Sequence, residues 1–349
     1  MSKQKKIIGI MVALFAAFGL VAAGLAFNTQ KPAVSWQAHR DVIEAVVFSS
    51  DGQRLASVGR DNAVHLWNAT DGKPLGTFDT TSIYGALAFS PKNGWLACGF
   101  DQKVVLLDAN DLRERKTLPF DFEVSSLAVS SDGRFLAVGG GNVNFRDESK
   151  TFGQICVLDA GSGNSKFTSE KLQKPIHALA MSNDGVWLAY SDAKESPRLL
   201  NWQMEKAESI PFGKGAASQL SFLEDGKSLV VHYEQDLPNL TVWSYLDPKA
   251  EWEAVPVNGN MAFRSAVSCD GKWVALGTVA NTFLGKAPKH GLQLFEAKGT
   301  KPIVDLAFGN GLLGGKLHAT SIAFSPKADT LAIGLSNGEI RLWRVADFY

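Results

Sequence analysis

Seven copies of one sequence cassette predict an all-β fold, a seven-bladed β-propeller of four-stranded blades, preceded by one hydrophobic N-terminal segment expected to be a transmembrane helix. Each copy has an apolar strand ending near Ser, a tight turn that is Asp-Gly in most copies, and a second strand resembling Leu-Ala. Single sheets of this kind cannot bury both faces alone. Radial stacking of the blades is the physical solution.

The copies recur at the period of one propeller blade. Their serine-equivalent positions are separated by 41, 40, 52, 41, 45 and 57 residues, and most of these spacings match the blade period of about 40–45 residues. The cassettes are VVFSSDGQRLASVG from Val46, LAFSPKNGWLACG from Leu87, LAVSSDGRFLAVG from Leu127, LAMSNDGVWLAYS from Leu179, LSFLEDGKSLVVH from Leu220, SAVSCDGKWVALG from Ser265 and IAFSPKADTLAIG from Ile322. A third strand follows each cassette, ending at Trp67, Asp108, Asp159, Trp202, Ser244, Glu296 and Trp343.

Charge and cysteine content exclude several classes of partner. Lys plus Arg equals Asp plus Glu at 35 each, so no net field attracts a phosphate backbone, and we expect no nucleic-acid partner. Cys98, Cys156 and Cys269 lack the spacing of a metal or redox pair, and we interpret them as packing residues. We expect no cofactor.

The N-terminal region divides into three short segments before the propeller. Residues 7–27 carry no charge, and about 20 helical residues cross the hydrocarbon core of a bilayer. Three lysines within residues 1–6 keep that end cytoplasmic by the positive-inside rule. Residues 28–32 are then a linker, and the propeller at 33–349 lies outside the cytoplasm, in the periplasm if the chain is bacterial. The protein is thus expected to be single-pass and bound to the lipid bilayer through residues 7–27.

A cleaved signal peptide is the alternative interpretation of the same stretch. Val21-Ala22-Ala23 or Gly24-Leu25-Ala26 could serve as a small-residue cleavage site after the apolar run. Cleavage there would leave a soluble secreted or periplasmic propeller. We favour the anchor, because the apolar run is longer than the usual core of a signal peptide.

Residues 33–343 resemble the WD-repeat proteins, and the first blade carries the resemblance best. Ala38-His39 stands where that family has Gly-His, followed by Ser57, Asp61 and Trp67. The resemblance implies that His39, Ser57, Asp61 and Trp67 form a hydrogen-bonded network that staples the blade, which is a structural role. The other blades depart from this pattern: Asp101 has no histidine or tryptophan partner, and blade seven offers Asn337 and Trp343.

The way in which the ring closes predicts the face of the propeller at which the N-terminal segment joins it. Only six residues follow Trp343, so residues 33–37 are expected to supply the outer strand of blade seven. With strands a to d running outward, the a–b and c–d loops share one face, here called the turn face. The b–c and d–a connections share the other, here called the insertion face. A strand d begins at the turn face, and a five-residue linker reaches at most about 18 Å, so the turn face is expected to lie against the membrane.

Three insertions all project from the insertion face. They are residues Asn142–Gln154, Val279–His290 and Phe308–Ala319. Long loops within regular repeats usually carry function, although they can also be tolerated insertions, and the third could tuck its apolar side chains into the propeller. The candidate partner-binding residues are Asn142, Asn144, Arg146, Asp147, Phe283, Lys286, Lys289, Leu312, Leu313, Lys316 and His318.

The sequence contains no recognisable catalytic or metal-binding motif. The six histidines are interpreted as falling in different blades without ligand spacing, and no nucleophile elbow or phosphate loop is present. We interpret Gly139-Gly140-Gly141 as a flexible turn, and Trp95, Trp187 and Trp273, which share one repeat position, as blade packing. The histidines are His39, His65, His177, His232, His290 and His318.

The sequence therefore favours a non-catalytic, membrane-anchored scaffold or accessory subunit. It would bind protein partners, integral membrane subunits first among them, through its propeller loops. Two other classes stay open. One is an exported propeller enzyme of the hydrolase or lyase type, with its site at the mouth of the central channel. The other is a soluble exported ligand or peptide binder, released by signal cleavage.

Overall fold

The regular elements of the described part of the chain are strands, apart from two short 3₁₀ helices. The computed structural model describes residues 31–82, 85–92, 94–192, 194–204, 209–211, 215–233, 240–244, 261–279, 291–297, 301–308 and 317–348. The stretch expected to span a membrane, residues 7–27, lies outside them. Within those described ranges, no helix has the length and apolarity needed to cross a bilayer.

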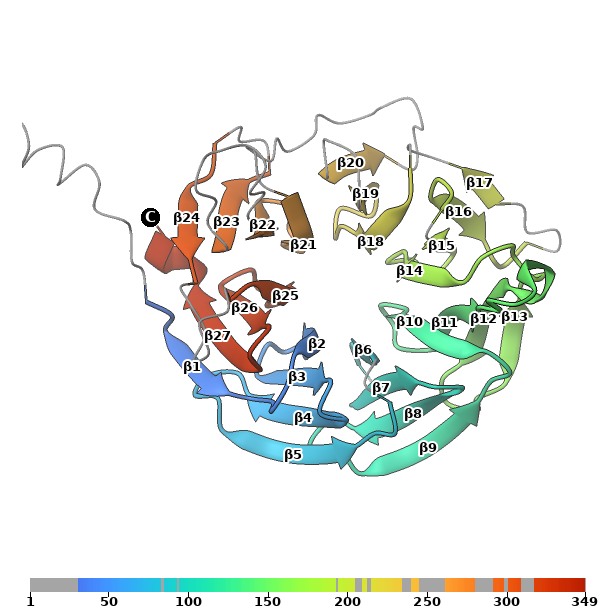
Figure 1. The fold of residues 1–349 in the computed structure, drawn as a ribbon, viewed down its shortest axis with the longest axis horizontal. Coiled ribbons are helices and arrows are strands. Elements are labelled where there is room, and N and C mark those ends of the chain that lie inside the picture. Colours follow the sequence, from blue (N-terminus) through green and yellow to red (C-terminus); the bar gives the residue numbers. More distant parts are fainter. Residues whose placement is uncertain are drawn as a thin grey trace, which may run out of the picture. The chain divides into compact units, whose positions relative to one another are not determined.

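Seven antiparallel sheets stand around a common centre, as the sequence predicts (Figure 1). Blades one to three are β2 (Ile43–Phe48), β3 (Arg54–Gly59), β4 (Ala63–Asn68), β5 (Pro74–Asp79); β6 (Ala86–Phe89), β7 (Trp95–Phe100), β8 (Lys103–Asp108), β9 (Glu114–Pro119); and β10 (Glu123–Val129), β11 (Phe135–Asn142), β12 (Phe152–Asp159), β13 (Ser165–Thr168). Blades four to six are β14 (Ile176–Met181), β15 (Trp187–Asp192), β16 (Arg198–Asn201), β17 (Ser209–Pro211); β18 (Ala217–Phe222), β19 (Ser228–Tyr233), β20 (Leu240–Ser244); and β21 (Met261–Val267), β22 (Trp273–Val279), β23 (Gly291–Glu296), β24 (Val304–Ala307). Blade seven is β25 (Ala319–Phe324), β26 (Thr330–Leu335), β27 (Glu339–Arg344) and, from the other end of the chain, β1 (Val34–Gln37).

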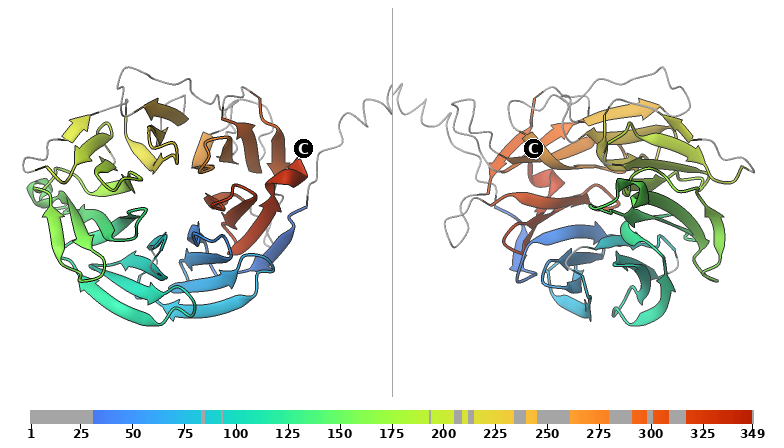
Figure 2. Two further views of the ribbon diagram at one scale, coloured as in Figure 1. Left: turned by 180° about the vertical axis from the view of Figure 1, so that it is seen from behind. Right: turned by 45° about the vertical axis from the view of Figure 1, so that its right-hand side comes forward.

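The prediction of ring closure is confirmed. β1 pairs antiparallel with β27, with Val34 opposite Leu342 and Gln37 opposite Glu339. Figure 2 shows β1 along the outer edge of the last blade. Because Val34 faces the end of β27, the chain enters the propeller at the turn face. After β27 a short 3₁₀ helix, η3 (Val345–Phe348), buries Val345 and Phe348 against the last blades.

The repeated cassette builds the same a–b turn in blade after blade. In blade three the buried Ser130 hydroxyl donates to the Asp132 carboxylate (2.5 Å) and accepts the Phe135 N–H (2.9 Å). The Asp132 carboxylate also accepts the Arg134 N–H, and Gly133 has φ of 73°, a left-handed conformation that favours glycine. The serines at the corresponding positions of blades one, four and six bond in the same way. In blade seven Ser325 donates instead to Asp329, four residues further on. The repeated pattern of the cassette therefore stabilises the a–b turn through side-chain hydrogen bonds to the backbone.

The core lies between neighbouring blades. Apolar side chains of adjacent sheets pack in successive clusters around the ring, and the cluster of blades two and three contains Trp95, Leu106, Leu136 and Phe122. Trp187 and Trp273 pack against other such clusters. The prediction that these tryptophans pack the blades is confirmed.

The glycine run in blade three is a strand, and its interpretation as a flexible turn was wrong. Gly140 and Gly141 lie in β11, and a Cβ on Gly140 would stand 2.0 Å from the Glu123 carbonyl oxygen. On Gly141 it would stand 2.1 Å from the Phe152 carbonyl oxygen, and on Gly153 2.0 Å from the Lys174 carbonyl oxygen. Only glycine permits these backbones to approach so closely.

Candidate functional site

The first insertion extends a hairpin of blade three on the insertion face. β11 and β12 continue into the expected loop at both ends, with Gly140 opposite Gln154 and Asn142 opposite Phe152. The connection itself is therefore only residues 143–151, here called the blade-three loop. An isolated bridge between Gly153 and Leu172 ties its base to the segment that leads into blade four.

Internal hydrogen bonds fix the blade-three loop. The Asn144 side-chain oxygen accepts the N–H groups of Arg146 (3.0 Å) and Asp147 (2.9 Å), and the Asn144 N–H donates to the Thr151 hydroxyl (3.0 Å). Asp147 caps the short 3₁₀ helix η1 (Glu148–Lys150) by accepting the Ser149 N–H. Asn144 and Asp147, predicted to bind a partner, therefore shape the loop itself.

Asn142 has a similar role at the base of this loop. Its side-chain oxygen accepts the Glu123 N–H (3.1 Å) and its amide group donates to the Asp121 carbonyl (3.3 Å). Both bonds hold the end of β11 against the start of β10. Of the four residues predicted here, Arg146 is the one whose side chain is mainly exposed.

The most exposed apolar side chain of this loop is one that sequence reasoning missed. Phe145 is 97% exposed and its neighbour Val143 is 54% exposed. A fully solvated aromatic ring on an ordered loop is unusual for a monomer, since single aromatic rings bury large apolar areas when they can. The signal available in the sequence was a lone aromatic within the polar run Asn144 to Asp147.

A groove lies beside this loop on the insertion face. Its volume is about 920 Å³, and its walls come from the blade-three loop, from the connection into blade four and from the b–c loop of blade four. Four of the lining side chains are lysines and one is a glutamate. We call this the lysine groove; it is lined by Glu148, Ser149, Lys150, Thr151, Phe152, Lys171, Leu172, Gln173, Lys174 and Lys194.

The other two insertions lie largely outside the described residues. Phe283, Lys286 and Lys289 of the second, and Leu312, Leu313 and Lys316 of the third, are not described. At the ends of the third insertion, Phe308 and Leu317 are buried in the same cluster. His318 is half-buried, and its backbone exchanges hydrogen bonds with Ser336. The described ends of this insertion therefore pack into the propeller.

In blade one, the structure joins the four side chains that the resemblance pointed to. The Trp67 indole N–H donates to the Ser57 hydroxyl (2.9 Å), which lies 2.7 Å from Nε2 of His39. Nδ1 of His39 lies 2.8 Å from the Asp61 carboxylate. Since a carboxylate only accepts, Nδ1 carries the proton and Nε2 accepts from Ser57. This chain of bonds connects the entry to blade one with β3, β4 and the turn between them.

The pKa values of this network describe a neutral histidine beside a charged aspartate. Burial lowers the pKa of His39, against the opposing effect of Asp61. Burial raises the pKa of Asp61, but the hydrogen bonds from the Arg40 N–H and His39 outweigh it, and the net shift is downward. The contact between His39 and Asp61 is therefore a hydrogen bond of a neutral imidazole, with no ion pair at neutral pH.

The interpretation of the histidines as falling in different blades was wrong for one pair. His39 and His65 both belong to blade one, with ring centroids 4.7 Å apart, and together with Asp61 they have the spacing of a cation site. However, both nitrogens of His39 are already hydrogen bonded, and Nδ1 of His65 bonds to Thr77. Metal binding would break the bond to Ser57, so this cluster is better suited to stabilising the blade.

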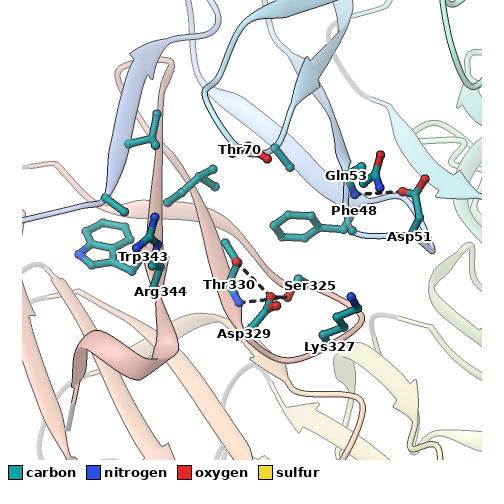
Figure 3. Close-up of a pocket in the computed structure, with 15 residues that line it drawn as sticks. Phe48, Asp51, Gln53, Thr70, Ser325, Lys327, Asp329, Thr330, Trp343 and Arg344 are labelled. Carbon is teal, nitrogen blue, oxygen red and sulfur yellow. Dashed lines mark hydrogen bonds between the residues drawn. The ribbon is translucent and has the colours of Figure 1, made fainter.

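A pocket of about 300 Å³ marks the closing seam on the turn face (Figure 3). Ala33 and Val34 border it together with the a–b turns of blades one and seven. The carboxylates in this pocket are engaged in their own turns: Asp51 accepts the Gln53 N–H, and Asp329 accepts the Ser325 hydroxyl. The pocket therefore lies where the N-terminal strand β1 joins the ring, and we assign it no binding role.

Ten carboxyl groups of the described residues have a shifted pKa, and most of them accept hydrogen bonds within turns. Each one whose pKa clearly departs from its ordinary value has it lowered. At Asp132 the Ser130 hydroxyl is the main cause and the Arg134 N–H the next. A general acid needs the opposite shift. Burial also raises the pKa of the Cys98 thiol to about 12, which makes it unreactive.

Known proteins match part of the chain in sequence and most of it in fold. Residues 30–68 match the family model described as "WD domain, G-beta repeat". The small ribosomal subunit protein RACK1 of Glycine max is 33% identical over 106 residues, which are 30% of this chain and 30% of that protein. RACK1 of Caenorhabditis elegans is 30% identical over 112 residues, 29% of this chain and 34% of that protein. The matched stretch thus spans about a third of these relatives' length.

One solved structure shares the architecture over most of its length. The β-propeller domain of Myceliophteria thermophila Cps50 (Swd1) superposes with a TM-score of 0.70 at 19% identity, covering 90% of this chain and 99% of that domain. At this identity the likeness concerns the fold alone. The chain is therefore a seven-bladed β-propeller in fold, and its residues 30–68 match the model of one WD repeat.

Proposed function

We propose that this chain is a membrane-anchored, non-catalytic scaffold or accessory subunit that binds protein partners of a larger membrane assembly outside the cytoplasm. The observation that carries the proposal is the different use of the two propeller faces. The chain enters at the turn face through β1. The ordered loop that exposes Phe145 stands on the insertion face.

The proposal of an anchor is supported by the sequence of residues 1–32 and by the place of β1. An uncharged stretch at 7–27 and a linker at 28–32 lead directly into a strand that hydrogen-bonds to the last blade. The proposed anchor is therefore connected to a strand of the closed ring and not to a flexible tail. The turn face would lie towards the bilayer, and the insertion face would point away from it.

The binding role draws support from the chemistry of the described residues and from the relatives. The lowered carboxyl pKa values leave turn aspartates charged, which suits hydrogen-bond acceptors and does not suit proton donors. The relatives' name, small ribosomal subunit protein, describes a component of a larger assembly. A propeller that presents loops to other chains fits the same pattern.

Purification in mild detergent after brief crosslinking tests the proposal. We expect the protein to migrate well above its own mass of 37.6 kDa with defined partner chains, and to stay with the membrane after carbonate washing. Migration alone at native size would contradict the scaffold role.

The start of the mature chain distinguishes anchoring from export. N-terminal sequencing should find the chain intact through residues 7–27. A mature start near Gly24 or Phe27 would refute the anchor and favour the soluble exported binder.

A further inference from the structure

We propose that the lysine groove and Phe145 together form a docking surface for an acidic, extended segment of a partner protein. The inference rests on the proposed function and names both the surface and the chemistry of its partner. The groove would take the acidic segment, and Phe145 would enter an apolar pocket next to that segment. Both parts belong to the insertion face.

Three connections on the same face build the groove. Residues 148–152 come from the blade-three loop and the start of β12, residues 171–174 from the connection into blade four, and Lys194 from the b–c loop of blade four. The bridge between Gly153 and Leu172 joins two of these walls through the backbone. The groove is thus a formed feature, held by strands and not by side-chain contacts alone.

Its charge is local and positive. Lys174 is paired with Glu148 at 2.5 Å, and Lys150 with Asp147 at 3.1 Å. Within the described part of the chain, neither Lys171 nor Lys194 is within ion-pair distance of a carboxylate. Because the whole chain has no net charge, attraction of an anion to this surface would come from the local lysines and not from the net charge of the protein.

Phe145 supplies the apolar part of the surface. Its ring is 97% exposed, while the bonds from Asn144 and to Thr151 fix the loop around it. Because the loop backbone is already fixed, burial of the ring would cost side-chain freedom but little ordering of the backbone. Buried aromatic residues commonly contribute most of the binding free energy of a protein interface.

The same details favour a protein over a nucleic acid or a bilayer. Single strands bind by stacking successive bases on several free aromatic faces. At this surface the Phe152 ring is covered by the Lys171 ammonium at 4.0 Å, which leaves Phe145 as its single free ring among the described residues. A bilayer reached through residues 28–32 would lie at the turn face, whereas the groove opens on the opposite face.

Binding of a defined peptide to the full-length protein in mild detergent tests this assignment. The probe is a short fluorescent peptide rich in glutamate with two central leucines, followed by anisotropy. Its counterpart with lysine in place of glutamate is the charge control. We expect the acidic peptide to bind at low salt, and Lys171→Glu with Lys194→Glu to weaken it about tenfold. Phe145→Ala should weaken it about thirtyfold.

A matched control on the other face makes the result specific. Lys227→Glu changes an exposed lysine next to the a–b turn of blade five and should leave binding unchanged. The three altered positions in the surface are exposed or line an open groove, so thermal melting should show unchanged folding. The proposal is overturned if the acidic peptide fails to bind, or if the surface variants and the Lys227 variant behave alike.

Two further probes separate the alternatives. If single-stranded oligothymidine or vesicles containing phosphatidylserine bind more tightly than the peptide, with the same dependence on Phe145 and Lys171, the surface belongs to another class of ligand. Copurified partners crosslinked only to turn-face lysines would leave the proposed function standing and overturn this assignment. If the protein purifies alone but binds the acidic peptide, the docking surface stands and the proposed scaffold function is overturned.

Discussion

The two faces of the propeller are built by different rules. On the turn face, serine, aspartate and a residue with positive φ repeat the same hydrogen-bonded turn, as at Ser49 and Ser268. On the insertion face, blade one carries a histidine network and blade three an extended hairpin, and these two features differ from each other. Repetition marks the parts that every blade needs to fold. Features found in one blade mark what distinguishes this protein from other propellers.

Blade three should depend most strongly on its glycines. Gly140→Ala places a Cβ 2.0 Å from the Glu123 carbonyl oxygen, so the backbone of β10 or β11 must move. We expect a loss of about 3–4 kcal/mol in the free energy of unfolding, measured by urea denaturation. Gly161→Ala is the control, because its Cβ would meet only the Asp159 carboxylate, at 3.5 Å. Equal effects of the two changes would contradict close backbone packing.

Blade one should depend on its histidine network. His39→Ala removes the bonds to Ser57 and Asp61 and leaves a buried hydroxyl without its acceptor. The expected cost is about 2–3 kcal/mol in the same assay. Asp101→Asn in blade two keeps a residue that tolerates the φ of 49° at this position and alters only the bond from Thr81, so it should cost clearly less. A similar loss in both blades would mean that blade one has no special staple.

Acid should act on the same network. Burial lowers the pKa of both His39 and His65, so the unfolded chain binds more protons than the folded one just below the ordinary value of 6.5. Stability should therefore be full above pH 6.5 and fall as the pH decreases from there towards the folded-state pKa values. Melting temperatures from pH 8 to 5 measure this, and the loss should be smaller in a His39→Gln variant. An unchanged profile in that variant would assign the loss to other groups.

The turn face should respond more weakly to single changes, since each turn is one of several. Ser130→Ala removes one acceptor for the Phe135 N–H and one donor to Asp132. We expect a loss of about 1 kcal/mol. The corresponding change Ser268→Ala in blade six should give the same value within error, because its bonds to Asp270 and Trp273 are the same. Unequal values would show that the turns are not equivalent.

The sequence predicted the features that repeat from blade to blade. It did not predict features that depend on one close contact in the folded chain. Seven cassettes were enough for the blades, because alternation and turn chemistry are local. Strand parity within the blades then predicted the closure by residues 33–37 and the face of the blade-three loop. Gly139-Gly140-Gly141 was misread because glycine indicates a turn and a close backbone contact equally well. His39 and His65 were assigned to different blades, although they are only 26 positions apart and one blade is longer than that. Phe145 was overlooked because exposure depends on the fold around a residue.

The smallest effect on stability is expected at the residue to which we assign the most binding. Phe145 is 97% exposed, so Phe145→Ala removes almost no buried area, and the unfolding free energy should change by less than about 0.5 kcal/mol. Asn144→Ala, which removes the acceptor for two N–H groups, should instead loosen the loop and speed amide exchange at Arg146 and Asp147. If Phe145→Ala were destabilising, the ring would be part of the loop's own packing. If Phe145→Ala instead keeps its stability and loses peptide binding, the residues that fold this face are distinct from the residue that binds the partner.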